Sequence, residues 1–589
     1  MYGVATSAGV MDLQLRDIQE HRYILDDYNS HLASIRWAFT PRILPLSSPS
    51  SPSLTRWFLL VLVTLLMLPV LAVLGAWFPV GAESGQALSI LQEMAATVLP
   101  DYLWTTVLLC LMVTVGVAGV GLSAAVAVTL FEFPGRRFFE WALLLPLAMP
   151  AYVVAYAYTD FLQFSGPLQT GLRAALGVEG RLFPEVRNVA GAAWVFTFTL
   201  YPYVYLLART ALGERTVHLM EAARLMGAPM RRRMQEVALP LARPAVAAGI
   251  ALALMETLAD FGVSSYFGIQ TFTAGIYKAW LSMDNRIAAA QLAGMLLVFV
   301  AILLGLEHRA QHRMRFAVTK GARGNTSDAQ AVPLHGRHRV LVWVLCATPV
   351  LMGFVLPVLF MLRPLLADWA ELPWSRFGEW AVNSVRLASI TAVLAVAVAL
   401  ALAFQVRRSG HWAVGGAANI AGLGYAIPGA VVVVGLLVPV GWLQAWAPEW
   451  QVGYWVTATA IGIVWAYLVR FSAVALQSLQ SGYARLPTSL DDSARMLGAT
   501  GTQTLVRVHW PLLRRSVAAA ALLVFVDVMK ELPATLVLRP FNSDTLAVVA
   551  YQLARDERLG EAALPSLALV LVGLIPVILL SRTLRSTAR

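Results

Sequence analysis

Long apolar runs separated by short charged segments dominate this sequence and most constrain its fold. A run of about 18 or more apolar residues can cross the hydrocarbon core of a bilayer as a helix. The chain is 58% hydrophobic and only 13% charged, whereas soluble domains carry about 25% charged residues. We therefore predict an all-α polytopic membrane protein with about twelve transmembrane helices. The expected spans lie near 57–79, 104–130, 141–160, 189–209, 243–264, 288–306, 340–361, 383–405, 416–440, 454–473, 514–534 and 563–582.

The basic residues lie mainly in the short segments between these runs. The net charge is +11, from 44 Lys and Arg against 33 Asp and Glu. If the N-terminus is cytoplasmic, about 32 of the 44 Lys and Arg fall in cytoplasmic segments, as the positive-inside rule expects. Membrane topology thus accounts for the positive charge, and we expect no nucleic acid partner. Both termini are predicted to be cytoplasmic.

The two halves of the chain resemble each other in register. "TTVLL" at 105–109 precedes "LAMPAYVVAYAY" at 147–158, and "NSVRL" at 383–387 precedes "YAIPGAVVVVGL" at 425–436. Because each half holds an even number of spans, the two six-helix repeats should run parallel. The expected parts are a cytoplasmic N-terminal extension at 1–56, a first transmembrane domain at 57–306, a cytoplasmic linker at 307–339, a second transmembrane domain at 340–582 and a cytoplasmic tail at 583–589.

The strongest functional signal is a long cytoplasmic loop after the fourth span of each half. It reads "EAARLMGAPMRRRMQEVALPLARP" at 221–244 and "DDSARMLGATGTQTLVRVHWPLLRR" at 491–515. A short helix, a Gly that permits a sharp turn, and a second short helix ended by a Pro would form a compact knob. An ordinary amphipathic turn at the membrane interface is the alternative, but two copies at matching places favour a docking element.

These segments resemble the EAA loops of permease subunits of binding-protein-dependent ABC importers, the first copy more closely than the second. In that family the loop docks on an ATPase. The resemblance therefore implies a multi-pass permease in the bacterial inner membrane that works with two copies of an ABC ATPase subunit and a periplasmic solute-binding protein. The residues that carry this role by resemblance are Glu221, Ala222, Ala223, Gly227, Pro240, Asp492, Ala494, Gly498 and Pro511.

The sequence contains no G-x-x-x-x-G-K-[ST] pattern, so it lacks a phosphate cradle of that type. We expect no catalytic residues and no cofactor bound by this chain, and ATP and Mg would act on the partner ATPase. The H-E-x-x-H pattern is also absent, and the His and Cys residues show no ligand spacing, so a membrane-embedded enzyme is disfavoured.

Each loop leads into a span that carries two acids spaced four residues apart. These acids are Glu256, Asp260, Asp527 and Glu531. A spacing of four places each pair on one helix face, and ionisable groups in a membrane usually face a cavity or a partner. The four carboxylates are therefore candidates for a cation path or gate, with no metal site firmly assigned. The alternative is that Lys530, Arg539 or helix ends satisfy these acids structurally.

The segment "KELPATLVLRPFNSDTLA" at 530–547, together with the fused two-domain layout, resembles ferric iron importer permeases. The resemblance implies that a periplasmic protein delivers ferric iron to a permease that works by alternating access. Related fused permeases carry thiamine or an aminoethyl phosphonate, and their first half can hold a segment like "LADFG" at 258–262. These are the alternative cargoes. An ion-driven secondary transporter is a less favoured class, because it would need no paired docking loops.

Aromatic, cysteine and histidine side chains offer weaker signals. Near the external ends of spans we favour an interfacial aromatic belt over a lining of the pathway. The aromatic residues concerned are Tyr266, Tyr277, Trp280 and Tyr551. Cys110 and Cys346 fall within apolar runs and are expected to be small core residues. His218, His308 and His509 fall in predicted cytoplasmic loops and are expected to be interfacial or solvated.

Overall fold

The computed structural model describes residues 52–77, 83–213, 217–318, 332–409 and 412–586. Most of the predicted N-terminal extension, the middle of the predicted linker and the last three residues of the predicted tail lie outside the described residues. Contacts divide the chain into the units Met1–Phe58 and Leu59–Arg589. All contacts discussed below belong to the second unit.

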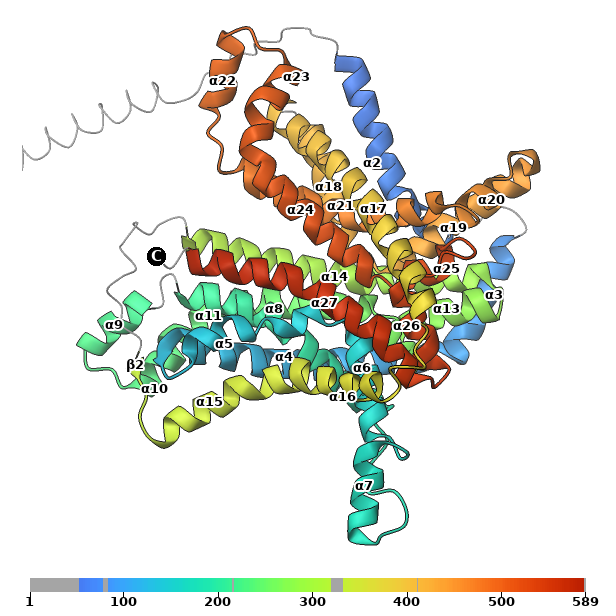
Figure 1. Ribbon diagram of the computed structural model, residues 1–589. Helices are drawn as coiled ribbons and strands as arrows, with labels where there is room; N and C mark the ends of the chain where they lie inside the picture. The colour runs from blue at the N-terminus through green and yellow to red at the C-terminus, as the bar shows by residue number, and fades with distance from the viewer. Residues whose placement is uncertain (1–51, 78–82, 214–216, 319–331, 410–411, 587–589) are drawn as a thin grey trace, which may run out of the picture. The chain divides into compact units, whose positions relative to one another are not determined.

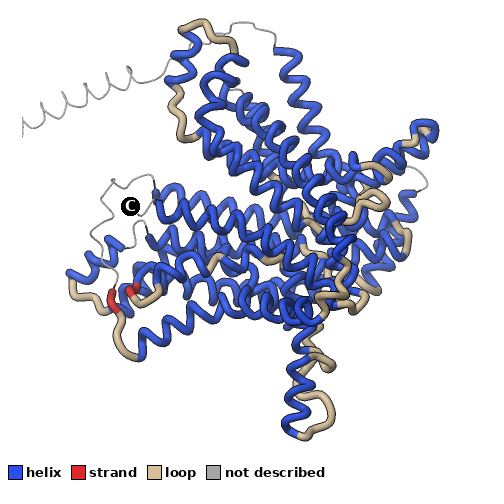
Figure 2. Tube along the Cα trace, in the orientation of Figure 1, coloured by secondary structure: helices blue, strands red, loops and turns tan. Residues whose placement is uncertain are grey.

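Helices make up nearly all of the described chain, as Figure 1 and Figure 2 show. We call the elements up to the predicted linker the first half. They are α2 (Pro52–Gly75), α3 (Glu83–Ala96), α4 (Leu99–Leu130), β1 (Phe131–Glu132), α5 (Arg136–Ala142), η1 (Leu145–Ala148), α6 (Ala151–Leu162), α7 (Pro167–Leu176), α8 (Val189–Ala211), α9 (Val217–Leu225), α10 (Met230–Arg233), η3 (Met234–Ala238), α11 (Leu239–Ala259), α12 (Gly262–Phe267), α13 (Phe272–Tyr277), η4 (Lys278–Ser282) and α14 (Arg286–Val318).

The remaining elements form the second half. They are β2 (Val332–Pro333), α15 (Arg337–Val350), η5 (Leu351–Val355), α16 (Leu356–Ala367), α17 (Trp374–Ser409), α18 (Trp412–Gly422), η6 (Gly424–Ala426), α19 (Gly429–Trp446), η7 (Pro448–Trp450), α20 (Val452–Thr457), α21 (Ala460–Tyr483), α22 (Ser489–Met496), α23 (Gly501–Thr504), η8 (Leu505–His509), α24 (Trp510–Lys530), α25 (Pro533–Leu538), α26 (Leu546–Arg555) and α27 (Leu559–Ser586). Strands β1 and β2 pair in parallel, with Phe131 opposite Val332, and they are the only β structure in the described ranges.

The all-helical class is confirmed, but the number of spans is smaller than predicted. Within the described residues, nine helices are long and apolar enough to cross a membrane. A tenth crossing results if the pair Arg136–Ala148 and Ala151–Leu176, bent by 89°, counts as one span. The other two predicted spans are also helical. However, the apolar helix found for α2 covers only Val61–Gly75, and α24 carries charged residues near both of its ends.

Helix boundaries recur along the chain. Helices α11 and α24 begin and end 271 positions apart, and the same offset relates α10 to α23, η3 to η8 and α12 to α25. Helices α6 and α19 both begin directly after a proline, Pro150 or Pro428, and these prolines are 278 positions apart. The shared local signals explain why the same elements form in the same order.

Helix α2, the first of the described helices, packs on elements of the second half. The Trp465 indole in α21 donates a hydrogen bond to the carbonyl of Leu65 in α2 at 3.0 Å. Gly435 in α19 allows a close approach, because a Cβ there would lie 2.0 Å from the carbonyl oxygen of Pro69. In Figure 1, α2 accordingly runs beside the helices of the second half.

The first helices of the second half pack in return on the first half. The Tyr158 hydroxyl in α6 donates to the carbonyl of Met352 in η5 at 2.7 Å. The rings of Phe161 and Phe360 stack with their centroids 3.9 Å apart. Figure 1 shows α15 and α16 alongside α4 and α6. Each half thus packs against helices that belong to the other.

Candidate translocation cavity and coupling loops

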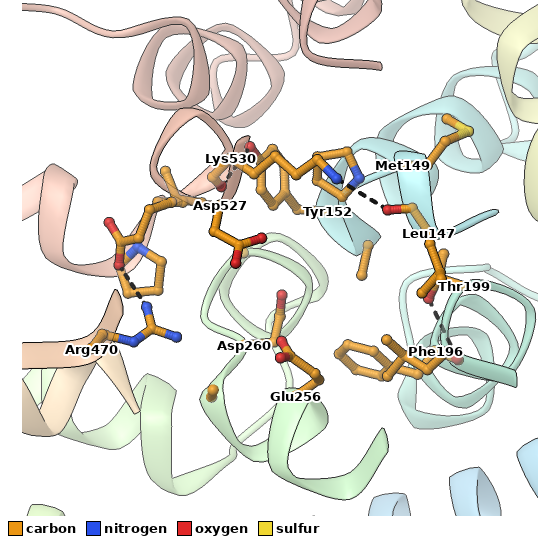
Figure 3. Close-up of a pocket in the computed structure, with 18 of the residues that line it drawn as sticks. Leu147, Met149, Tyr152, Phe196, Thr199, Glu256, Asp260, Arg470, Asp527 and Lys530 are labelled. Atoms are coloured by element: carbon orange, nitrogen blue, oxygen red, sulfur yellow. Dashed lines mark hydrogen bonds and ion pairs between the residues drawn. The ribbon is translucent and has the colours of Figure 1, made fainter. Parts of the chain in front are cut away.

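A cavity lies between the two halves, near the C-terminal ends of α11 and α24. Its volume is about 200 Å³. Its polar lining consists of Tyr152, Thr199, Tyr203, Glu256, Asp260, Tyr425, Arg470, Asp527, Lys530 and Glu531. Figure 3 shows Glu256, Asp260 and Asp527 pointing into the same space. The structure therefore brings together all four acids that the sequence singled out.

Glu256 and Asp527 occupy matching positions near the ends of α11 and α24. The hydroxyl of Tyr425, at η6 of the second half, donates to Glu256 Oε1 at 2.6 Å. This carboxylate of the first half is thus held by the second half. Asp527 lies close to Lys530 of its own helix in Figure 3.

Asp260 and Glu531 do not share a helix face with these acids, so that prediction is wrong. Helix α11 ends at Ala259 and α24 ends at Lys530, and the residue after each has an extended backbone, with ψ angles of 131° and 123°. Gly262 and Pro533 follow two residues later, and both residue types disfavour continuation of the helix. The chain therefore breaks before the second acid of each pair.

Both displaced acids cap the short helix that follows. Asp260 Oδ1 accepts a hydrogen bond from the main-chain N–H of Val263 at 2.8 Å. Glu531 accepts from the main-chain N–H groups of Ala534 and Thr535 at 2.9 and 3.0 Å. These bonds satisfy donors that would otherwise lie unpaired at the start of α12 and α25.

The two basic groups of the cavity have different partners. Arg470 Nη1 lies 3.1 Å from Glu531 Oε1, and both side chains are buried. The ammonium of Lys530 donates instead to the main-chain carbonyl of Leu147 in the first half, at 3.0 Å. Arg539 pairs with another acid outside the cavity lining. The alternative that these acids are satisfied structurally therefore holds for Glu531, which is paired with Arg470 and caps a helix.

The remaining charge of the lining is acidic. With Arg470 and Glu531 paired, three carboxylates face one ammonium. Carboxylate and hydroxyl oxygens suit hard cations. Among the described residues, no three Asp, Glu, His or Cys side chains lie close enough to hold a metal ion.

Each predicted docking loop turns at a glycine with a left-handed backbone. Gly227 lies between α9 and α10 with a φ of 83°, and Gly498 lies between α22 and α23 with a φ of 76°. Side chains rarely adopt this conformation without strain. No described atom lies within 4 Å of the position that a Cβ would occupy at either glycine. The backbone angle, and not a lack of space, requires Gly here.

The two residues before each glycine form an exposed apolar tip. Leu225 and Met226 are 83% and 80% exposed, and Met496 and Leu497 are 89% and 88% exposed. Large apolar side chains this exposed, away from the apolar spans, indicate a surface that a partner covers. Both loops present the same tip at matching positions.

The other motif residues divide between two faces of the loop helices. Ala223 and Ala494 are buried, whereas Ala222 is exposed. Glu221 and Asp492 lie on the outer side, and each is paired with the Arg three residues later, at 3.6 and 3.5 Å. The small inner side chain lets the loop helix approach the protein, and the acid remains available at the surface.

Pro240 and Pro511 do not end the second short helix, contrary to our prediction. The helix runs on from Met230 to Ala259, and each proline is the second residue of a long helix, α11 or α24. A π-helical segment, η3 or η8, precedes it. A proline lacks the N–H for an α-helical bond and clashes with the carbonyl four residues earlier, and a wider π turn relieves both problems.

A polar network, which the sequence did not reveal, ties α22 of the second loop to α17, α21 and η8. Arg407 Nε donates to Asp491 Oδ2 at 2.7 Å, and its other nitrogens donate to three main-chain carbonyls within 483–487 at 3.0 to 3.1 Å. His509 Nε2 lies 2.5 Å from Asp491 Oδ1, and its Nδ1 lies 3.3 Å from the Tyr483 hydroxyl. The loop is thereby anchored to three helices.

The centre of this network is buried and charged. Burial raises the pKa of Asp491, but hydrogen bonds and charge from Arg407 and His509 outweigh it, and the pKa lies below its usual value. His509 is 1% exposed and packs against Phe404 and Tyr483, so the expected interfacial or solvated histidine is wrong. The alignment of the two halves could have revealed this network, because Asp491 and His509 match the apolar residues Met220 and Ala238 of the first half.

The predicted aromatic belt is also wrong for three of its four residues. Tyr266, Tyr277 and Tyr551 are between 2% and 7% exposed. Tyr277 donates to a main-chain carbonyl of the second half at 2.6 Å, and the hydroxyls of Ser265 and Tyr551 are 2.8 Å apart. Tyr277 and Tyr551 therefore contribute to the contact between the halves, whereas Tyr266 packs against Tyr156 of the first half. Trp280 is partly buried.

Comparisons with known proteins agree with these features. Residues 118–316 match the family of binding-protein-dependent transport system inner membrane components. Over 539 residues the chain is 25% identical to the Fe(3+)-transport system permease protein FbpB 2 of Haemophilus influenzae, which covers 91% of this chain and 99% of that protein.

Two further relatives differ in cargo. The chain is 23% identical over 433 residues to the ferric transport system permease protein FbpB of Actinobacillus pleuropneumoniae, with 70% of this chain and 61% of that protein covered. It is 26% identical over 264 residues to the sulfate transport system permease protein CysW of Escherichia coli, with 44% and 89% covered.

Proposed function

We propose that this chain, which its match at residues 118–316 places in the family of binding-protein-dependent inner membrane transport components, imports ferric iron. The family match establishes the coarser role, the permease subunit of an ABC importer. A component of this kind has no ATPase activity of its own, and it works with an ATPase and a solute-binding protein.

The acidic cavity carries the proposal of a cationic cargo. Glu256, Asp260 and Asp527 face a single ammonium, that of Lys530, once Arg470 is paired. Ferric iron is a hard cation that prefers oxygen ligands. Two relatives, one of which is matched over nearly its whole length, are named as ferric iron permeases, and this supports the same cargo here.

Other cargoes fit the cavity less well. A sulfate permease is among the relatives, but a lining with an excess of carboxylates would repel an oxyanion. An aminoethyl phosphonate would meet the same repulsion at its phosphonate group. Thiamine, which is a cation, remains the stronger alternative. An ion-driven secondary transporter is disfavoured by the family match.

The paired loops support the rest of the mechanism. We assign the exposed tips before Gly227 and Gly498 to the docking surfaces for two ATPase subunits on the cytoplasmic side. The recurring helix boundaries support two parallel repeats related by an axis along the membrane normal. The five-part division of the chain and the cytoplasmic location of both termini belong to the same proposal.

Uptake of radiolabelled ferric iron, delivered with its binding protein, tests this function. Cells that lack the chain should lose iron uptake, and the wild-type chain should restore it. A Glu256→Gln, Asp527→Asn double variant should not restore it, whereas Glu371→Gln, an exposed acid outside the cavity, should. Thiamine, aminoethyl phosphonate and sulfate uptake are measured in parallel. Unchanged iron uptake with loss of one of these would replace iron by that cargo.

A further inference from the structure

Two hydrogen bonds join the halves on the cavity wall, and in both of them one partner belongs to the turn before α6 or α19. The Tyr425 hydroxyl at η6 donates to Glu256 Oε1 near the end of α11 at 2.6 Å. The Lys530 ammonium at the end of α24 donates to the carbonyl of Leu147 at η1 at 3.0 Å. Tyr425 and Leu147 are 278 positions apart, the offset that relates η6 to η1. Each contact thus links the turn before α6 or α19 to the last turns of the opposite long helix.

Both contacts border the space that a cargo would occupy. Tyr425, Glu256, Leu147 and Lys530 all line the cavity. The Tyr152 hydroxyl reinforces the second contact by donating to the main-chain carbonyl of Lys530 at 3.3 Å. In this enclosed setting a hydrogen bond to a charged group is stronger than in water, so the two contacts hold the halves together across the path.

The Lys530 contact is suited to release. Among the described residues its ammonium has no carboxylate within 4 Å, and it rests on a neutral main-chain carbonyl. A bond from an ammonium to a carbonyl lacks the full attraction of an ion pair. The Arg470 guanidinium is neutralised by a direct ion pair with Glu531. The Lys530 ammonium has no such pair within the described ranges and bridges the two halves instead.

We propose that Tyr425 and Lys530 act as two latches that keep the translocation path closed. A positive charge in the cavity opens both latches. This deepens the proposed cation import. A cation that binds the Glu256 carboxylate competes with the Tyr425 hydroxyl for the same oxygen. The same cation repels the Lys530 ammonium, which lines the same cavity. One event thus weakens both contacts, and the halves separate only when both are broken.

The test uses the permease reconstituted in lipid vesicles with its ATPase subunits. Basal ATP hydrolysis is measured without the binding protein, and then with the iron-loaded binding protein. If the latches hold the resting state, Tyr425→Phe and Lys530→Met should each raise basal hydrolysis several-fold, up to about tenfold for the loss of one charge-assisted hydrogen bond. Stimulation by the loaded binding protein should fall in proportion. Lys530→Arg keeps a donor and should stay nearer to wild type.

Tyr467→Phe is the matched control. Its side chain is buried and its hydroxyl lies 2.7 Å from Thr535 Oγ1, but that bond stays within the second half. The control should keep wild-type basal hydrolysis. Basal hydrolysis that is unchanged in Tyr425→Phe, or that rises equally in Tyr467→Phe, would overturn the latches. Tyr425→Phe removes a single oxygen, so it decides the matter alone if Lys530→Met fails to assemble.

Failure of the latches and failure of the cargo assignment give different results. Raised basal hydrolysis in the variants does not depend on which cargo is carried. If iron-loaded binding protein fails to stimulate the wild-type complex while the variants still show raised basal hydrolysis, the latches stand and the iron proposal falls. If iron-loaded binding protein stimulates the wild-type complex but basal hydrolysis in the variants is unchanged, the iron proposal stands and the latches fall.

Discussion

The proposed coupling loops of the two halves share a backbone conformation and an exposed tip. Each turns at a glycine with positive φ, presents two apolar side chains before it, and leads through a π-helical segment into a long helix. They differ in what holds them to the protein. A charged network around Asp491 anchors the second loop, whereas apolar packing holds the first.

The matching positions of the first half cannot form this network. Thr129 stands at the position of Arg407, Met220 at that of Asp491 and Ala238 at that of His509. Met220 and Ala238 belong to the apolar core and are 6% and 0% exposed. The Thr129 hydroxyl is buried and has no hydrogen-bond partner among the described residues.

The same loop structure is therefore attached to the protein in two different ways. Hydrogen bonds and ion pairs depend on direction, whereas the hydrophobic effect does not. We therefore expect the second loop to move as one body with α17 and α24. The first loop can shift slightly on its apolar support. Movement of the ATPase would then reach the two halves unequally.

Replacement of both loop glycines should have the largest effect. In a Gly227→Trp, Gly498→Trp double variant, positive φ angles become strained and the tips change shape, so uptake should be lost while the protein still inserts in the membrane. Gly415→Trp is the control, because that glycine has open space around its Cβ position and no left-handed φ. Normal uptake in the double variant would refute the assignment of both loops as coupling elements.

Neutralisation of Asp491 should come next. Asp491→Asn leaves the buried Arg407 guanidinium without its carboxylate, which should weaken attachment of the second loop by about 3 kcal/mol. The rate of proteolytic cleavage within the loop, measured in detergent, should rise accordingly. Asp492→Asn is the neighbouring control: its exposed pair with Arg495 should contribute less than about 0.5 kcal/mol. Equal cleavage of the two variants would contradict a special anchor at Asp491.

Replacing the charged residues around Asp491 by their first-half counterparts should weaken attachment of the second loop less than Asp491→Asn does. The triple variant Arg407→Thr, Asp491→Met, His509→Ala removes the charged partners together and leaves no buried charge unpaired. We expect a cost of about 1 kcal/mol in the same proteolysis assay, below that of Asp491→Asn. A triple variant that is cleaved faster than the single variant would show that the polar bonds themselves hold the loop.

The smallest effect should come from the charge around the first tip. Arg231 and Arg232 are exposed, and the second loop has Thr502 and Gln503 at the matching positions. Arg231→Gln with Arg232→Gln should weaken ATPase binding by less than about 1 kcal/mol and reduce its salt dependence. Binding is measured at low and high salt. An unchanged salt dependence would mean that the two tips dock alike despite their charges.

Local patterns in the sequence predicted much of this structure. Every predicted span is largely helical, although several contain a break, because long apolar runs have few other solutions in lipid. The positions of Gly227 and Gly498 were predictable because a left-handed turn favours glycine. The four acids could be grouped in advance because the repeat placed them at matching positions.

One error concerns a local break in each long helix, and the others concern contacts between residues far apart in sequence. The helix breaks before Asp260 and Glu531 were missed because a spacing of four was taken as a continuous helix. The Asp491 anchor was missed because Arg407 lies 84 positions before it. No local pattern could show that the ammonium of Lys530 reaches a carbonyl 383 positions away.

The packing of α2 on the second half has a consequence for biosynthesis. The indole that bonds Leu65 belongs to Trp465, 400 positions later in the chain. At about 5–20 residues per second, the ribosome needs about 20–80 s to supply that partner after Leu65 is made. Helix α2 must therefore remain without these final neighbours for most of translation. Quality control in the membrane has the whole of that interval to act on an incomplete chain.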